Sequence, residues 1–135
     1  MEVDEIVVIP KTMEKFFGCS GKMVKPSIRT VKQIVEQIPK GKLYTLEQIK
    51  EKLAFDFNVQ TACPASINKA LLILSKEEKP ICYWRVIKKK GELISKFPDG
   101  VEGHGLLLEI EGFEIDTSKK YPIVFEFRDK LAEIK

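Results

Sequence analysis

Few residues of this chain could carry out covalent chemistry. The 135 residues include three cysteines, Cys19, Cys63 and Cys82, and a single histidine, His104. Nucleophilic catalysis needs a thiol or hydroxyl beside a base, and His104 is 22 residues away from Cys82 in the sequence. No Cys-His or Ser-His-Asp set follows from this spacing. We expect Cys63 and Cys82 to be buried structural residues and His104 to lie at the surface, with Cys82 as the one candidate nucleophile.

The same composition argues against metal and cofactor sites. Three scattered cysteines and one histidine cannot form a disulfide framework or a four-ligand zinc site, and the sequence predicts no metal. No glycine-rich segment joins a strand to a helix as phosphate-binding loops do, so no cofactor is expected. The longest apolar run, from Ala70 to Leu74, is too short to cross a membrane. The acidic start is unlike a secretory signal, and we expect a cytoplasmic monomer.

The charge of the chain is unevenly distributed. Residues 22–90 contain fifteen lysines and arginines against six acids, a net charge of +9. Residues 1–21 and 91–135 carry net charges of −2 and −4. A basic centre between acidic ends is typical of a protein with one surface facing a polyanion. A lysine-rich solvated surface is the alternative interpretation.

The elements around these residues can be predicted from periodicity. Apolar residues at helical spacing predict helices over residues 28–38, 46–53 and 64–74. Ser27, Thr45 with Gln48, and Cys63-Pro64 supply their start signals. Residues 81–87 then have the β-branched and aromatic composition of a strand, 88–91 form a basic turn, and 92–95 can return. Three helices followed by a hairpin define an α+β winged helix-turn-helix.

The remaining segments are less strongly patterned. We expect a short strand at residues 7–10, a helical turn at 13–17, a linker at 21–26 and a loop at 55–61. Beyond the hairpin, the pattern predicts a helix over 102–111, strands over 113–116 and 121–127, and a terminal helical turn over 128–134.

Several sequence blocks occur in an order that resembles a known family. The blocks are Ile38-Pro39-Lys40-Gly41-Lys42-Leu43-Tyr44-Thr45, Ala70-Leu71, Tyr83-Trp84-Arg85-Val86-Ile87, Gly91-Glu92-Leu93 and Leu106-Leu107-Leu108-Glu109-Ile110-Glu111-Gly112. They resemble the C-terminal DNA-binding domain of the alkylguanine-DNA alkyltransferases, and more closely the alkyltransferase-like proteins. The resemblance divides the chain into an N-terminal extension (1–26), a winged-helix domain (27–112) and a C-terminal strand-helix addition (113–135). It implies minor-groove binding of double-stranded DNA and rotation of an alkylated guanine into a pocket.

The chain departs from the family at the reacting residues. The resemblance places Tyr83 at the position of the cysteine nucleophile and Trp84 at that of its histidine, while Glu111 retains the family glutamate. Ala65 stands where the family has an arginine that fills the space left by the flipped base. Leu46 stands where it has a tyrosine that helps to rotate the nucleotide. These departures weaken the case for flipping and argue against methyl transfer.

The sequence as a whole predicts a non-enzymatic DNA-binding protein acting in DNA repair, with repair proteins as further partners. Two alternatives are a methylated-DNA–protein-cysteine methyltransferase using a displaced Cys82, and a protein-interaction module on the same scaffold. We expect Ser66, Asn68, Lys69, Lys88, Lys89 and Lys90 to contact DNA, and Tyr83, Trp84, Arg85 and Glu111 to form the pocket. Tyr83 is the first candidate for the pocket wall, and Trp84 is expected to be either a second wall residue or part of the core. Arg85 is expected to pair with Glu111 or to bind a phosphate.

Overall fold

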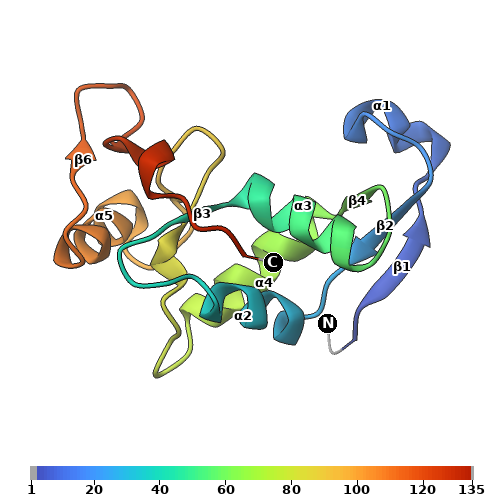
Figure 1. Ribbon diagram of the computed structural model, residues 1–135, viewed down its shortest axis with the longest axis horizontal. Helices are drawn as coiled ribbons and strands as arrows, with labels where there is room; N and C mark the ends of the chain where they lie inside the picture. The colour runs from blue at the N-terminus through green and yellow to red at the C-terminus, as the bar shows by residue number, and fades with distance from the viewer. Residues whose placement is uncertain (1–2, 135) are drawn as a thin grey trace.

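The computed structural model describes residues 3–134, and it begins with a small sheet at one end of the molecule (Figure 1). Strand β1 (Glu5–Val8) pairs antiparallel with β2 (Lys22–Lys25), and β2 pairs parallel with β4 (Thr61–Ala62). The helical turn between β1 and β2, α1 (Glu14–Phe17), ends at Gly18 with a positive φ of 73°, as expected for a glycine cap. The expected linker at residues 21–26 is wrong, because β2 occupies it and is hydrogen-bonded on both edges.

The centre of the molecule is built from three helices whose start signals are readable in the sequence. These are α2 (Ile28–Glu36), α3 (Leu46–Asp56) and α4 (Pro64–Ser75). Ser27 caps α2, and Thr45 and Gln48 form the reciprocal capping box of α3. The faces that pack together carry the expected apolar residues, which include Val31, Ile34, Val35, Ile49, Leu53, Ile67, Ala70, Leu71 and Leu74, all buried. Periodicity and caps agree here with the long-range packing.

The segment expected to form a strand over residues 81–87 does not do so. Tyr83–Arg85 form a short 3₁₀ helix, and only β5 (Val86–Ile87) is extended. The backbone N–H of Arg85 donates to the carbonyl of Cys82 at 3.2 Å, a local bond that replaces a sheet ladder. Strand β5 pairs parallel with β3 (Tyr44–Thr45) at the start of α3. The aromatic residues are therefore held against the helical core and not in a free hairpin.

The basic turn at residues 88–91 is present, but the hairpin around it is incomplete. The N–H of Gly91 donates to the carbonyl of Lys88 at 2.9 Å, which closes the turn. Gly91 has a φ of +84° and faces the ring of Phe127, so a side chain at this position would be strained and would clash. The returning chain does not form a ladder with residues 81–87; Glu92 bridges Ile123 in the C-terminal part of the chain.

The C-terminal part forms a second, smaller apolar cluster. Helix α5 (Gly100–Ile110) packs beside the antiparallel strands β6 (Ile115–Asp116) and β7 (Ile123–Val124). Buried residues of this cluster are Leu43, Ile87, Leu93, Leu108, Phe113, Val124 and Phe127. The strand expected over 121–127 is only two residues long. The expected terminal helix is a 3₁₀ turn at Phe127–Lys130, followed by extended chain.

Figure 1 shows the resulting layout, with the sheet of β1, β2 and β4 at one end, the helices α2–α4 in the centre, and α5 with β6 at the other end. Among residues 3–134, no helix has the length and apolar content needed to span a bilayer.

Candidate functional site

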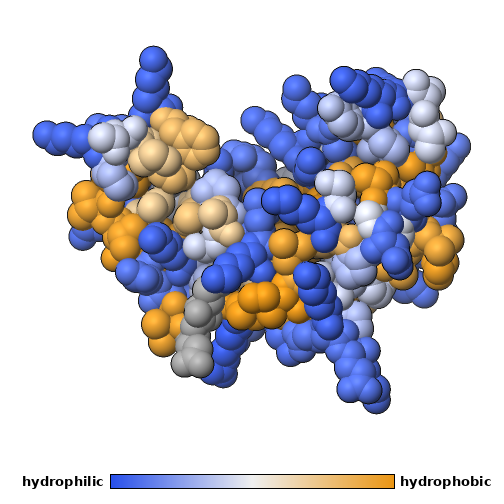
Figure 2. Space-filling model, turned by 180° about the vertical axis from the view of Figure 1, so that it is seen from behind, coloured by the Kyte–Doolittle hydropathy of each residue, from blue (hydrophilic) through white to orange (hydrophobic). Residues whose placement is uncertain are grey.

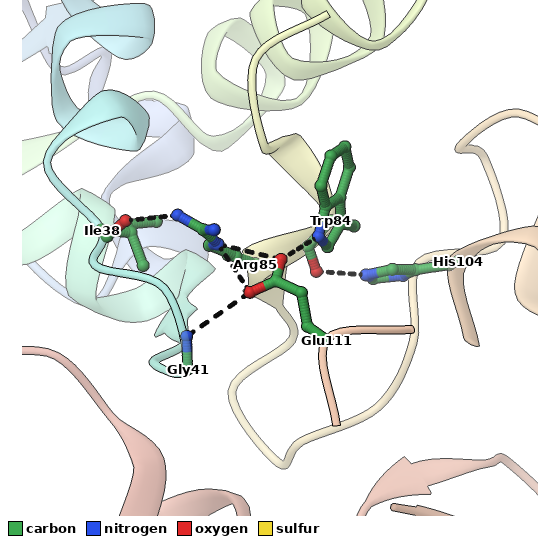
Figure 3. Close-up of polar contacts among 6 residues, drawn as sticks. All are labelled: Ile38, Gly41, Trp84, Arg85, His104 and Glu111. Carbon is green, nitrogen blue, oxygen red and sulfur yellow. Dashed lines mark hydrogen bonds and ion pairs between the residues drawn. The ribbon is translucent and has the colours of Figure 1, made fainter. Parts of the chain in front are cut away.

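A cluster of polar contacts joins the 3₁₀ helix at Tyr83–Arg85 to the end of α5 (Figure 3). Arg85 Nε lies 3.0 Å from Glu111 Oε2 and 3.1 Å from Oε1, and the Trp84 indole N–H donates to the same carboxylate. The Arg85 guanidinium also donates to the carbonyl of Ile38 at 2.8 Å, and the N–H of Gly41 approaches Glu111 at 3.4 Å. The pairing of Arg85 with Glu111 expected from the sequence is confirmed.

This ion pair is largely removed from water. The side chains of Arg85 and Glu111 are 13% and 8% exposed. Burial raises the pKa of Glu111, but hydrogen bonds from Arg85, Trp84 and Gly41 and the charge of Arg85 outweigh it and hold the pKa below its ordinary value. The carboxylate is therefore ionised at neutral pH, and its contacts fix the Trp84 ring relative to α5.

His104 is fully buried in α5, and the expectation that it lies at the surface is wrong. Its Nδ1 accepts from the N–H of Ile94 at 3.0 Å, so the proton is on Nε2, which donates to the carbonyl of Trp84 at 2.8 Å. Burial lowers the pKa of His104 to about 4, although the bond to Trp84 opposes that shift. With both ring nitrogens bonded to backbone groups, His104 is unavailable as a base for Cys82.

Tyr83 is a core residue, whereas Trp84 is half-buried. The Tyr83 ring is 4% exposed and packs edge-to-face on Phe97, with 4.8 Å between ring centroids. Burial, and then the charge of Asp99, raise the pKa of its hydroxyl. Trp84 contacts both apolar clusters and spans the boundary between them. The role expected for Tyr83 as the pocket wall therefore does not match this packing, whereas Trp84 packs against the core without being fully enclosed.

A cavity of about 230 Å³ lies between the start of α3, the side of α4 and the chain at residues 94–97. Its lining includes Leu46, Asn68, Leu71, Lys88, Ile94 and Phe97. Tyr83 is not among the lining residues; it supports Phe97 from behind. The cavity is somewhat smaller than the roughly 300–1,000 Å³ of pockets for drug-sized ligands, a size that suits a small planar group. We call it the α3–α4 cavity.

Of the six residues expected to contact DNA, three line this cavity or the hollow next to it, namely Asn68, Lys88 and Lys89, whereas Ser66, Lys69 and Lys90 do not. Asn68 and Lys69 are exposed on α4, Ser66 is half-buried one turn earlier, and the three lysines of the basic turn are exposed. Asn68 and Lys88 line the α3–α4 cavity, while Asn68 and Lys89 line a neighbouring hollow of about 240 Å³ beside Pro64. The fold thus brings α4 and the basic turn to the opening of the same cavity, the α3–α4 cavity. That these residues contact DNA stays a prediction.

Some residues of the cavity were missed by sequence reasoning. Ile94, Ser95, Lys96 and Phe97 follow the basic turn and line one side of the cavity. The composition of residues 92–95 predicts a returning hairpin strand. It gives no indication that this segment lines the α3–α4 cavity. The N–H of Ile94 is held by the buried His104, and that contact has no periodic signature in the sequence.

Comparison with known proteins supports the fold. No protein-family model matches the sequence, and no curated protein matches it. The overall arrangement is similar to that of an alkyltransferase-like protein of known structure. The crystal structure of S. pombe Atl1 in complex with damaged DNA containing O6-carboxymethylguanine is similar, with a TM-score of 0.60 and 20% sequence identity. The match covers 79% of this chain and 94% of that chain, and it confirms the expected alkyltransferase-like fold.

Proposed function

We propose that this protein binds double-stranded DNA and recognises an alkylated guanine without repairing it, as part of DNA repair. The observation that carries the proposal is the α3–α4 cavity, which opens between the polar face of α4 and the basic turn at residues 88–91. A base rotated out of the duplex needs apolar surface for its ring beside groups that hold the backbone. The cavity offers Leu46, Leu71 and Phe97 for the ring, with Lys88 at its edge. The likeness to Atl1, whose structure contains damaged DNA, supports the same ligand class.

The proposed DNA-contacting surface combines cations with a helix start. Lys88, Lys89 and Lys90 are exposed and would contact phosphates, with the turn acting as the wing of a winged helix-turn-helix. Helix α4 starts at Pro64 without a side-chain cap from Cys63, so its first free N–H groups can donate to a phosphate oxygen. Ser66, Asn68 and Lys69 follow within the next turns and would lie closest to the groove.

The absence of alkyl transfer is part of the proposal. Tyr83 takes the position that the resemblance assigns to the nucleophile. Its side chain is buried against Phe97, and the pKa of its hydroxyl is raised. Cys82 is half-buried beside it, and both nitrogens of the single histidine are engaged by backbone groups. A thiol without a base is poorly activated for attack on an alkyl group.

A titration tests the whole proposal. The protein is mixed with matched duplexes that contain guanine or O6-methylguanine, at two salt concentrations, and its mass is measured afterwards. We expect tighter binding of the alkylated duplex and an unchanged protein mass. A mass gain equal to the alkyl group that disappears in Cys82→Ser would establish the methyltransferase alternative, and equal, salt-independent affinities would favour the protein-interaction alternative.

Filling the cavity tests the role of the α3–α4 cavity directly. Ser95 is exposed and lines the cavity, so Ser95→Trp should occupy it without disturbing the core. We expect this variant to lose its preference for the alkylated duplex while keeping its affinity for the unmodified one. Ser20→Trp is the matched control, because Ser20 is exposed and lies outside the cavity. An unaltered preference in Ser95→Trp would place recognition elsewhere.

A further inference from the structure

A second hollow lies between α5 and the strands β6 and β7, separate from the α3–α4 cavity. It encloses about 530 Å³, and its lining includes Leu93, Val101, Leu106, Ile115 and Pro122 as apolar residues. Gly105 lies in the floor, where an added Cβ would meet Leu93 at 3.3 Å and Ile115 at 3.8 Å. We call this hollow the α5 groove. It shares no lining residue with the α3–α4 cavity.

The charge of the α5 groove is opposite to that of the proposed DNA surface. Glu102 and Glu109 are the charged residues in its lining, and both are exposed. They lie on α5 four residues before and three residues after Leu106, so all three side chains share one face of the helix. Within residues 3–134, neither glutamate forms a salt bridge. Their negative charges would repel a nucleic acid and attract a cationic group.

The apolar residues of this face are unusually open to water. Leu106 is 59% exposed inside the groove, and Ile110, one turn further along α5, is 73% exposed. Figure 2, which views the molecule from behind, shows hydrophobic surface at the edge that carries α5, next to hydrophilic side chains. Apolar residues grouped beside a concave surface and rimmed by charge are typical of protein interaction sites.

We propose that the α5 groove binds a basic, amphipathic segment of another protein. Apolar side chains of that segment would cover Leu106 and fill the groove, and its lysines or arginines would pair with Glu102 and Glu109. Charge complementarity favours this occupant over two others. The two carboxylates would repel a nucleic acid. A second copy of the chain would have to bind through its basic surface, which in the proposed function contacts DNA. The proposal goes beyond DNA recognition, because the groove and the cavity use different residues.

A designed peptide tests the groove on the full-length protein. The probe is a fluorescein-labelled peptide of about four helical turns, with leucines at helical spacing on one face and lysines and arginines elsewhere. Its affinity is measured by fluorescence anisotropy, and the contacted amides are mapped by nuclear magnetic resonance. We expect shifts at the groove residues of α5 and β6, and an affinity that falls with added salt. A peptide with glutamates in place of the basic residues should not bind.

Two pairs of variants distinguish specific peptide binding in the α5 groove from non-specific binding elsewhere on the surface. Leu106→Asp should weaken peptide binding roughly tenfold or more, as expected when a covered leucine is removed. The control Phe16→Asp changes a residue of α1 that is 72% exposed and lies outside the groove lining, and it should change peptide binding less than about twofold. Glu102→Lys with Glu109→Lys should weaken it by a similar factor, in contrast to the matched exposed pair Glu77→Lys with Glu78→Lys. Failure of the probe to bind, shifts mapped to another face, or equal effects of test and control variants would each overturn the proposal.

Discussion

The buried histidine makes the stability of this protein depend on pH in a range where little else titrates. His104 is the only histidine of the chain, and it is inaccessible to solvent, with both ring nitrogens bonded to the backbone of Ile94 and Trp84. Its pKa of about 4 in the folded protein lies well below the value of about 6.5 expected in the unfolded chain. Protonation therefore favours unfolding. The neutral imidazole stabilises the fold fully above pH 6.5, and that stabilisation is lost as the pH falls towards 4.

The size of this effect follows from the two pKa values. At pH 5, nearly all unfolded molecules but only about a tenth of folded ones carry the proton on His104, a difference that corresponds to about 2 kcal/mol. Between pH 7.5 and pH 5 we therefore expect the free energy of unfolding to fall by about 2 kcal/mol. Carboxylates contribute little in this interval, because most are already ionised at pH 5.

Urea unfolding at pH 7.5, 6 and 5 measures the change, and nuclear magnetic resonance of the imidazole reports its pKa and tautomer directly. His104→Phe keeps a planar ring beside Phe97 but removes the titrating group and leaves one N–H and one carbonyl unpaired. It should lower stability by about 2–6 kcal/mol at pH 7.5 and abolish the dependence between pH 5 and 7.5. A wild-type stability that is flat over this interval, or an imidazole pKa near 6.5, would contradict the proposed coupling of His104 protonation to unfolding.

Further predictions concern the ion pair, the basic turn and the tyrosine. Glu111→Gln leaves the Arg85 charge without its partner and should cost about 3–5 kcal/mol in urea unfolding. Glu47→Gln at the half-exposed pair with Lys50 should cost less than about 1 kcal/mol. Replacing Lys88, Lys89 and Lys90 together by alanine should weaken binding to all duplexes alike, and should reduce the salt slope by about 0.9 for each phosphate that these lysines neutralise; an unchanged slope would remove the turn from the interface. Tyr83→Ala should lower the free energy of unfolding by about 3–5 kcal/mol, as for other buried aromatic residues. Weaker binding to alkylated DNA alone, at an unchanged free energy of unfolding, would contradict the core position of Tyr83.

The helical core was predictable because local and long-range signals agree there. Ser27, the Thr45–Gln48 capping box and the Cys63-Pro64 start each fix a helix end by local hydrogen bonding or ring geometry. The apolar stripes then define which faces pack. Helix α5 also follows its sequence pattern, and the pairing of Arg85 with Glu111 is one of the two roles expected for Arg85.

The errors occurred where distant segments decide the local structure. Residues 81–87 have the composition of a strand, but the turn at Tyr83–Arg85 is imposed by burial of Tyr83 on Phe97 and by the contacts of Trp84 and Arg85 with Glu111. Strand β2 is only four residues long, and it is extended because β1 and β4 pair with it. A stretch of four residues is too short for its periodicity to reveal such pairing.

The burial of His104 does have a signal in the sequence. Residue 104 lies four positions before Leu108, so both side chains project from the same face of a helix whose other members include buried Gly105. A histidine on the apolar face of a helix is buried neutral when backbone groups can satisfy its two nitrogens. The partners, Ile94 and Trp84, come from other segments, and only the fold brings them together.

The structure also limits how selective lesion binding can be. The α3–α4 cavity is lined by five apolar side chains together with Asn68, Lys88, Ser95 and Lys96. Under the proposed function, the apolar part of this lining would recognise an alkyl group on a guanine by contact area. One additional methylene-sized group in an apolar pocket is worth about 1–3 kcal/mol, or roughly 10–200-fold. Under the proposed function, the affinity for the DNA backbone would come from the cations and would depend on salt. The ratio of the two dissociation constants, for alkylated and unmodified duplex, should therefore lie within about 10–200 and stay constant between two salt concentrations at which each constant changes several-fold. If the ratio of the two dissociation constants falls with salt as steeply as the affinities do, then charged groups, and not the apolar lining of the cavity, would distinguish the alkylated base.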